Sequence, residues 1–102
     1  MPLALGYQQV RLDTRPGEIE AGRDQLVRYC QREGFALGEI FVESDINRQC
    51  SALAALIGVA TANAPVTILV ASANDLGVMP RVRAATRARI IRETGCPVVI
   101  AA

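Results

Sequence analysis

The chain has 102 residues, of which 51% are hydrophobic and only 4% aromatic. This length predicts one domain whose core consists mainly of aliphatic side chains. The chain contains no histidine, which excludes the commonest general base and the commonest metal ligand. All eleven basic residues are arginine, and the formal net charge of +1 provides no overall attraction to nucleic acid.

The cysteines and the apolar segments indicate in which compartment the protein is expected and whether it crosses a membrane. Cys30, Cys50 and Cys96 are widely spaced and odd in number, which fits neither a disulfide framework nor a zinc site and favours free thiols in a reducing compartment. The uncharged segment 51–74 is interrupted by Pro65, so each apolar piece is far shorter than the ~20 residues of a membrane-spanning helix. We therefore expect a soluble cytoplasmic protein with no metal, cofactor or membrane association.

The first half of the chain predicts a strand, a helix and a second strand. The first strand is expected at Ala4–Leu12, with an irregularity near its two glutamines. The helix is expected at Glu18–Glu33, because apolar residues recur there at helical spacing, Pro16 suits its start and Gly34 its end. The second strand is expected at Phe35–Glu43.

The second half repeats this alternation. After a polar loop at 44–49, Ser51 is expected to cap a helix that ends near Asn63. The remaining elements are an apolar strand at Val66–Val70, a small-residue loop at 71–77, an arginine-rich helix at Val78–Glu93 and a last strand at Pro97–Ile100. Strands that alternate with helices predict a single α/β domain over residues 1–102, with a mainly parallel four-stranded sheet in a three-layer αβα arrangement.

The loops that follow the strands resemble the resolvase–invertase family of serine recombinases. Residues 9–14 read Gln-Val-Arg-Leu-Asp-Thr, where that family has Tyr-x-Arg-Val-Ser-Thr. Residues 20–34 resemble the family's next helix, and residues 51–53 stand where it has Pro-x-Leu. Residues 74–78 read Asn-Asp-Leu-Gly-Val, against the family's Asp-Arg-Leu-Gly-Arg. The resemblance implies the resolvase-like strand order 2-1-3-4.

The family's catalytic residues do not carry over. The resemblance places Asp13 at the nucleophilic serine and retains Arg11 as the first arginine. Cys50, Asp75 and Val78 stand where the family has further arginines. The family forms a covalent phosphoserine link to DNA, and a carboxylate at the nucleophile's place would repel a phosphodiester. We therefore expect no catalytic residues and no enzymatic activity.

Several residues at the expected sheet edge remain candidates for binding. The carboxyl ends of parallel strands are where ligands gather, so we expect a vestigial active site or ligand edge there. Its expected members are Arg11, Asp13, Arg48, Asn74 and Asp75. For Arg11 and Asp13, we favour a local ion pair and helix-start acceptor at the turn over a phosphate or ligand site.

The helix expected at 51–63 has apolar or small residues on every side, whereas a surface helix normally has a polar face. A neighbouring copy could cover it, with Leu53, Leu56 and Val59 as expected contacts, or small side chains are simply tolerated there.

The arginines of the last helix form no continuous stripe, which favours a solvated helix over a nucleic-acid surface.

Three functions from different classes follow. The first is a catalytically inactive resolvase-like domain that regulates or binds a protein partner, expected to self-associate. The second is a DNA-binding or recombination domain of a serine recombinase. The third is a module that binds a phosphate or nucleotide at the edge formed by Arg11, Arg48 and Asn74. We expect the first, with DNA as the less favoured partner.

Overall fold

A computed structural model describes residues 1–44 and 50–102. Four strands form one sheet, and every pairing in it is parallel. The elements follow the chain as β1 (Leu3–Val10), α1 (Glu18–Glu33), β2 (Ala36–Ser44), α2 (Ser51–Asn63), β3 (Thr67–Val70), the short 3-10 helix η1 (Ala73–Leu76), α3 (Pro80–Thr94) and β4 (Val98–Ile100). The strand order is β2-β1-β3-β4. The expected α/β architecture with a parallel four-stranded sheet is therefore confirmed.

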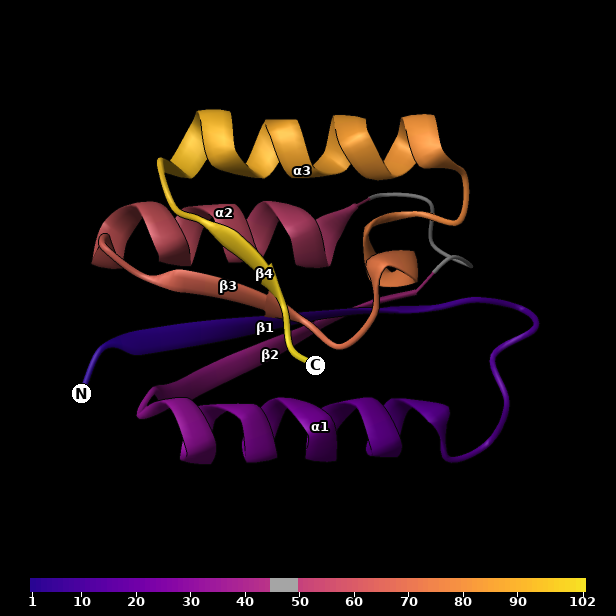
Figure 1. Cartoon of the computed structure of the whole chain (residues 1–102). Coiled ribbons are helices and arrows are strands. Elements are labelled where there is room, and N and C mark those ends of the chain that lie inside the picture. Colours follow the sequence, from indigo (N-terminus) through magenta and orange to yellow (C-terminus); the bar gives the residue numbers. More distant parts are fainter. Residues whose placement is uncertain (45–49) are drawn as a thin grey trace.

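The helices cover both faces of the sheet. Figure 1 shows α1 below the sheet and α2 and α3 above it. Two clusters of buried side chains correspond to these layers. The larger cluster includes Tyr7, Leu56 and Ile68 and lies between the sheet and α2, whereas the smaller includes Leu26 and Leu69 and lies between the sheet and α1. Alternating residues of β1 and β3 therefore contribute to opposite faces of the sheet, as period-2 geometry requires.

The helix boundaries follow local sequence signals. Helix α1 starts after Gly17 and ends at Gly34, and both glycines adopt the left-handed conformation that residues with a Cβ rarely adopt. Helix α1 spans the expected residues, and α2 ends at Asn63 as expected. Strand β1 ends two residues earlier than expected, and its irregularity lies between Ala4 and Gly6 instead of at the glutamines.

The start of α2 corrects one expectation. Ser51 is the first helical residue, and the residue that precedes the helix, Cys50, makes no side-chain capping bond. Instead, the buried carboxylate of Glu43 on β2 accepts a hydrogen bond from the backbone N–H of Leu53, at 3.0 Å. The first N–H groups of a helix need acceptors from outside it. Here a neighbouring strand provides one, and this is a long-range contact that local sequence does not reveal.

Candidate functional site

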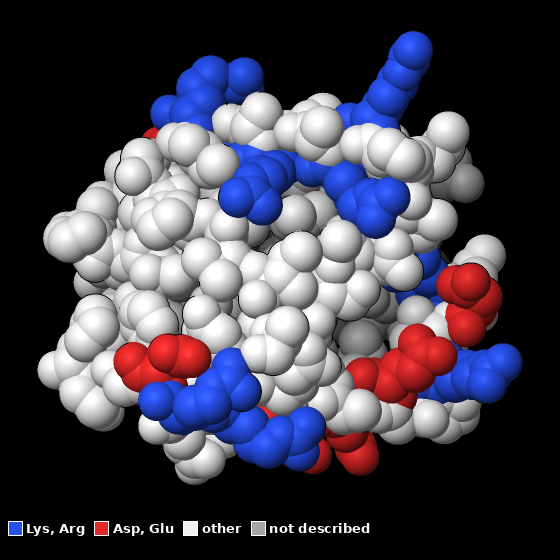
Figure 2. All heavy atoms as spheres, viewed as in Figure 1, with Lys and Arg blue, Asp and Glu red and all other residues white. Residues whose placement is uncertain are grey.

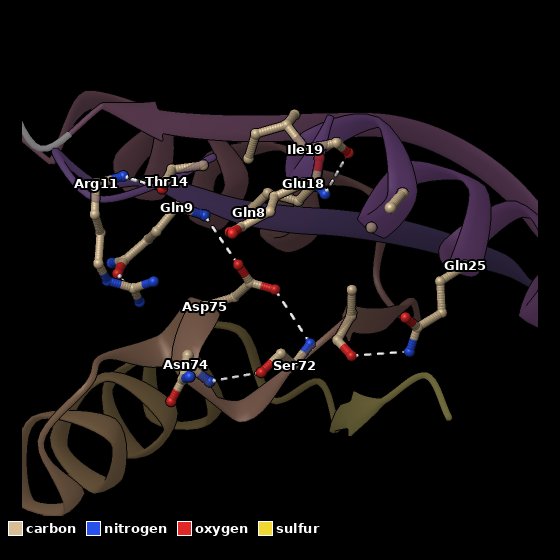
Figure 3. Close-up of a pocket in the computed structure, with 13 residues that line it drawn as sticks. Gln8, Gln9, Arg11, Thr14, Glu18, Ile19, Gln25, Ser72, Asn74 and Asp75 are labelled. Carbon is tan, nitrogen blue, oxygen red and sulfur yellow. Dashed lines mark hydrogen bonds between the residues drawn. The ribbon is translucent and has the colours of Figure 1, made fainter. Parts of the chain in front are cut away.

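A polar cavity lies where the carboxyl ends of β1 and β3 meet. In the sheet, β2 lies on one side of β1 and β3 lies on the other side. In such sheets the connections diverge at this point and leave a crevice that commonly binds ligands. The cavity has a volume of about 290 Å³ and lies between β1, the first half of α1 and the segment after β3 (Figure 3). Nine of its thirteen lining residues have polar side chains.

Asp75 connects the two strands at the cavity. Its Oδ1 accepts a hydrogen bond from the backbone N–H of Gln9, and its Oδ2 accepts one from the backbone N–H of Ser72, both at 3.2 Å. Burial raises the pKa of the Asp75 carboxyl, although these bonds and the charge of Arg11 oppose the shift. Asp75 therefore holds the end of β1 against η1, a structural role at a position where the resemblance expects an arginine.

Arg11 lies at the mouth of the cavity and is held in a turn. Its backbone N–H donates to Oγ1 of Thr14 at 2.7 Å, and the N–H of Thr14 donates to the carbonyl oxygen of Arg11 at 3.0 Å. Its Nη2 donates to Oε1 of Gln9 at 3.0 Å. Among the described lining residues, Arg11 is the only cation. Among the described residues, the guanidinium donates to no other partner, so within this part of the chain its remaining N–H groups can donate to an anionic group.

The predicted edge residues are brought together only in part. Arg11, Asn74 and Asp75 all line the cavity. Asp13 does not line it, because it lies exposed in the turn after β1. Within residues 1–44 and 50–102, no ion pair forms between Asp13 and Arg11. Arg48 falls outside the described residues.

Sequence reasoning missed the three glutamines that line the cavity, Gln8, Gln9 and Gln25. Gln8 is only 2% exposed, and its Nε2 donates to the carbonyl oxygen of Ile19 on α1, at 3.1 Å. The Nε2 of Gln25 donates to the carbonyl oxygens of Ala71, at 2.9 Å, and Ala101. The available signal was the strand period, which places Gln8 on the same face of β1 as the buried Ala4. A polar residue on a buried face requires partners.

The contact residues expected on α2 need correction. Leu53 and Leu56 are buried in the main core beneath α2, so they cannot contact another molecule. Val59 is 37% exposed and remains accessible. The correction follows from helical geometry, because the helix directs its longest side chains to the sheet and its smallest outward. The exposed side of α2 carries Ala54, Ala55, Gly58, Val59 and Ala62.

The arginines of α3 are spread along this helix (Figure 2). Arg81, Arg87 and Arg92 are exposed, and Arg89 forms an ion pair with Glu93 at 2.7 Å. Figure 2 also shows a broad uncharged area below these arginines, in the region where Figure 1 places β4 and α2. The visible face therefore combines separate arginines at its upper edge with a neutral centre.

Comparison of the chain with protein-family models, with curated proteins and with solved structures finds no significant match. Of the helices in the described part of the chain, none combines the length and apolar character needed to cross a membrane. The described residues also contain no cluster of three or more histidine, cysteine, aspartate or glutamate side chains suited to a metal ion.

Proposed function

We propose that this protein is a resolvase-like domain without strand-exchange chemistry that acts as an interaction module by associating with a second copy of itself. The motif resemblance supports the first part. The geometry agrees with it, because the edge presents a single described arginine, and both carboxylate oxygens of Asp75 already accept backbone hydrogen bonds. Phosphoryl transfer to a protein nucleophile would need several cations around the phosphate.

The observation that carries self-association is the uncharged exposed side of α2. None of the thirteen residues of this helix is charged, although eight of them are exposed. Apart from its two chain neighbours and the nearby backbone of its own helix, no atom of the described residues lies within 4 Å of the position that a Cβ of Gly58 would occupy. Small side chains allow the backbone of another helix to approach closely, and a neutral surface meets its own copy without repulsion between like charges. Two-fold symmetry then joins the same surface of both copies.

The mass of the protein in solution tests this proposal. We expect the wild-type chain to be dimeric by light scattering at high micromolar concentration. Gly58→Arg places a long cation on the exposed side of α2 and should give a monomer. The substitution should not unfold the chain, because the space around Gly58 is open and arginine favours helix more than glycine does.

The matched control is Gln31→Arg, which adds the same charge to the exposed surface of α1, on the opposite face of the sheet. This variant should remain dimeric. A monomeric wild-type chain at high micromolar concentration would overturn the proposal. An electrophoretic shift of duplex DNA at low salt would favour the DNA-binding alternative instead, since phosphate contacts weaken as salt rises.

A further inference from the structure

The orientation of the Gln8 and Gln25 amides determines which hydrogen-bonding groups line the inner part of the cavity. The NH₂ groups of Gln8 and Gln25 both donate to backbone carbonyl oxygens, which only an N–H group can do. Their own carbonyl oxygens accept no hydrogen bond from the described residues, yet no buried polar side-chain atom of that part of the chain lacks a partner. Each oxygen therefore keeps at least a small accessible surface, slight at Gln8 because that residue is only 2% exposed, and can accept a hydrogen bond from an N–H group of a ligand.

The charged side chains that line the cavity are unevenly distributed along it. Glu18 and Asp75 contribute carboxylates, whereas Arg11 is the only described cation of the lining. Figure 3 shows Arg11 at one end of the cavity and Gln25 at the other. One end therefore offers guanidinium N–H donors suited to a carboxylate, and the rest offers oxygen acceptors suited to an ammonium group. Among the described lining residues, a phosphate would meet two carboxylates and a single cation, a pattern that does not suit it.

The size of the cavity favours a small ligand. A volume of about 290 Å³ corresponds to roughly ten water molecules at the ~30 Å³ that each occupies in the liquid. A molecule of roughly ten non-hydrogen atoms would fill it.

We propose that this cavity binds a small zwitterion, of the class to which the free α-amino acids belong. The carboxylate of the ligand pairs with Arg11, and its ammonium group donates to the amide oxygens of Gln8 and Gln25, with Glu18 nearby. The proposal is independent of self-association, because the cavity and the exposed side of α2 share no residue.

The test is a titration of the isotopically labelled protein with each of the common free L-amino acids, followed by amide chemical shifts. We expect at least one of them to shift the amides of Gln8, Gln25 and Ala71 in a saturable way. For the tightest binder, the α-hydroxy acid analogue lacks the ammonium group and the carboxamide analogue lacks the carboxylate. Each analogue should bind at least about tenfold more weakly, the effect of losing one charge-assisted hydrogen bond.

Two variants separate specific binding from a general effect of charge. Arg11→Gln should weaken binding by about tenfold or more, because it removes the partner of the carboxylate. Arg15→Gln removes an exposed arginine that does not line the cavity and should bind as the wild type does. The Gly58→Arg variant should also bind normally, so failure of self-association and failure of ligand binding are measured separately.

Three outcomes would overturn the proposal. The first is that no amino acid shifts the amides of the cavity while the protein remains folded. The second is that the α-hydroxy acid binds as tightly as the amino acid, which would leave the ammonium group without a role. The third is saturable binding of inorganic phosphate in place of any amino acid, which would assign the cavity to phosphate.

Discussion

The carboxylate of Asp75 is nearly buried, yet both of its oxygens accept hydrogen bonds from backbone N–H groups. The two side chains cap the start of η1 together, because the Ser72 hydroxyl accepts a hydrogen bond from the N–H of Asn74 at 3.2 Å while the Asp75 carboxylate accepts one from the N–H of Ser72. The Asp75 side chain thus accepts hydrogen bonds from a backbone N–H group of β1 and from one at the start of η1. The position matters for the cavity because Asp75 is part of its lining.

Asp75→Asn should destabilise the fold by about 1–3 kcal/mol, because the amide NH₂ would face one of the two backbone N–H groups. The pH dependence should change as well. Burial raises the pKa of Asp75 above 3.8, so in the window just above pH 3.8 the folded chain holds more protons than the unfolded chain. The contribution of Asp75 to the free energy of unfolding therefore falls as the pH rises through this window. Urea denaturation at several pH values measures both effects.

The control for this substitution is Asp13→Asn, which changes an exposed carboxylate in the turn after β1. It should alter the free energy of unfolding by no more than about 0.5 kcal/mol. If Asp75→Asn retained both the wild-type stability and the wild-type slope with pH, the structural role assigned to Asp75 would be wrong.

At the residue scale, sequence predicted the cavity only in part. Arg11, Asn74 and Asp75 were expected at the edge because each follows the end of a strand, and all three line the cavity. Gln8 and Gln25 were missed because they lie within a strand and a helix. Their role depends on the distance between α1 and the sheet, which neither periodicity nor local motifs determine.

At the scale of elements, two glycines within helices have opposite surroundings. A Cβ added to Gly58 of α2 would meet no atom of the described residues within 4 Å outside the neighbouring backbone of its own helix. A Cβ added to Gly22 of α1 would lie 2.5 Å from Nε2 of Gln8 and 3.4 Å from Cβ of Ala71. The absence of a side chain at position 22 therefore leaves the space in which the Gln8 amide reaches the backbone of α1.

Gly58→Ala should raise the free energy of unfolding by about 0.5–1 kcal/mol, the usual gain when alanine replaces glycine in a helix interior. Gly22→Ala should lose that gain or destabilise, because the new methyl group displaces the Gln8 amide from its hydrogen bond to Ile19. Thermal or urea denaturation compares the two variants directly.

The double variant Gly22→Ala/Gln8→Ala provides the control, since removal of the amide makes room for the methyl group. It should be more stable than the sum of the two single substitutions, as expected for residues in contact. Equal gains from Gly22→Ala and Gly58→Ala would contradict the close contact between α1 and Gln8.

Helix α3 is the least buried of the three helices. Ile90 is its only fully buried residue, whereas Val82 and Ile91 remain 49% and 40% exposed. By contrast, β3 has buried residues at three of its four positions. Local stability should therefore differ strongly across the molecule.

We expect hydrogen exchange to be slowest at the amides of β1 and β3, which lie in the middle of the sheet and exchange only when the whole molecule unfolds. The amides of α3 should exchange at least about tenfold faster, through local opening of a helix with few buried contacts. Exchange followed by nuclear magnetic resonance measures both sets in one experiment. Equal protection in α3 and β3 would show that α3 unfolds only together with the sheet.

At the scale of the whole molecule, sequence predicted the fold more completely than the cavity. The alternation of apolar strands and helices predicted the parallel sheet, helix α1 spans the expected residues, and α2 ends at Asn63 as expected. The cap of α2 was assigned to Ser51 because local motifs cannot reveal that Glu43 of β2 lies nearby. The same holds for the expected contacts Leu53 and Leu56, because which side of a uniformly apolar helix faces the sheet depends on packing.

The position of β1 has a consequence for how the chain is assembled during synthesis. β1 is made first, and its pairing with β2 begins when residues near Ala36 are available. Its other edge pairs with β3, where Ala4 lies opposite Thr67, so that edge has no partner until about sixty further residues have left the ribosome. An unpaired edge is a template for pairing with other chains. The nascent β1–α1–β2 unit is therefore the stage at which this protein most needs protection from aggregation.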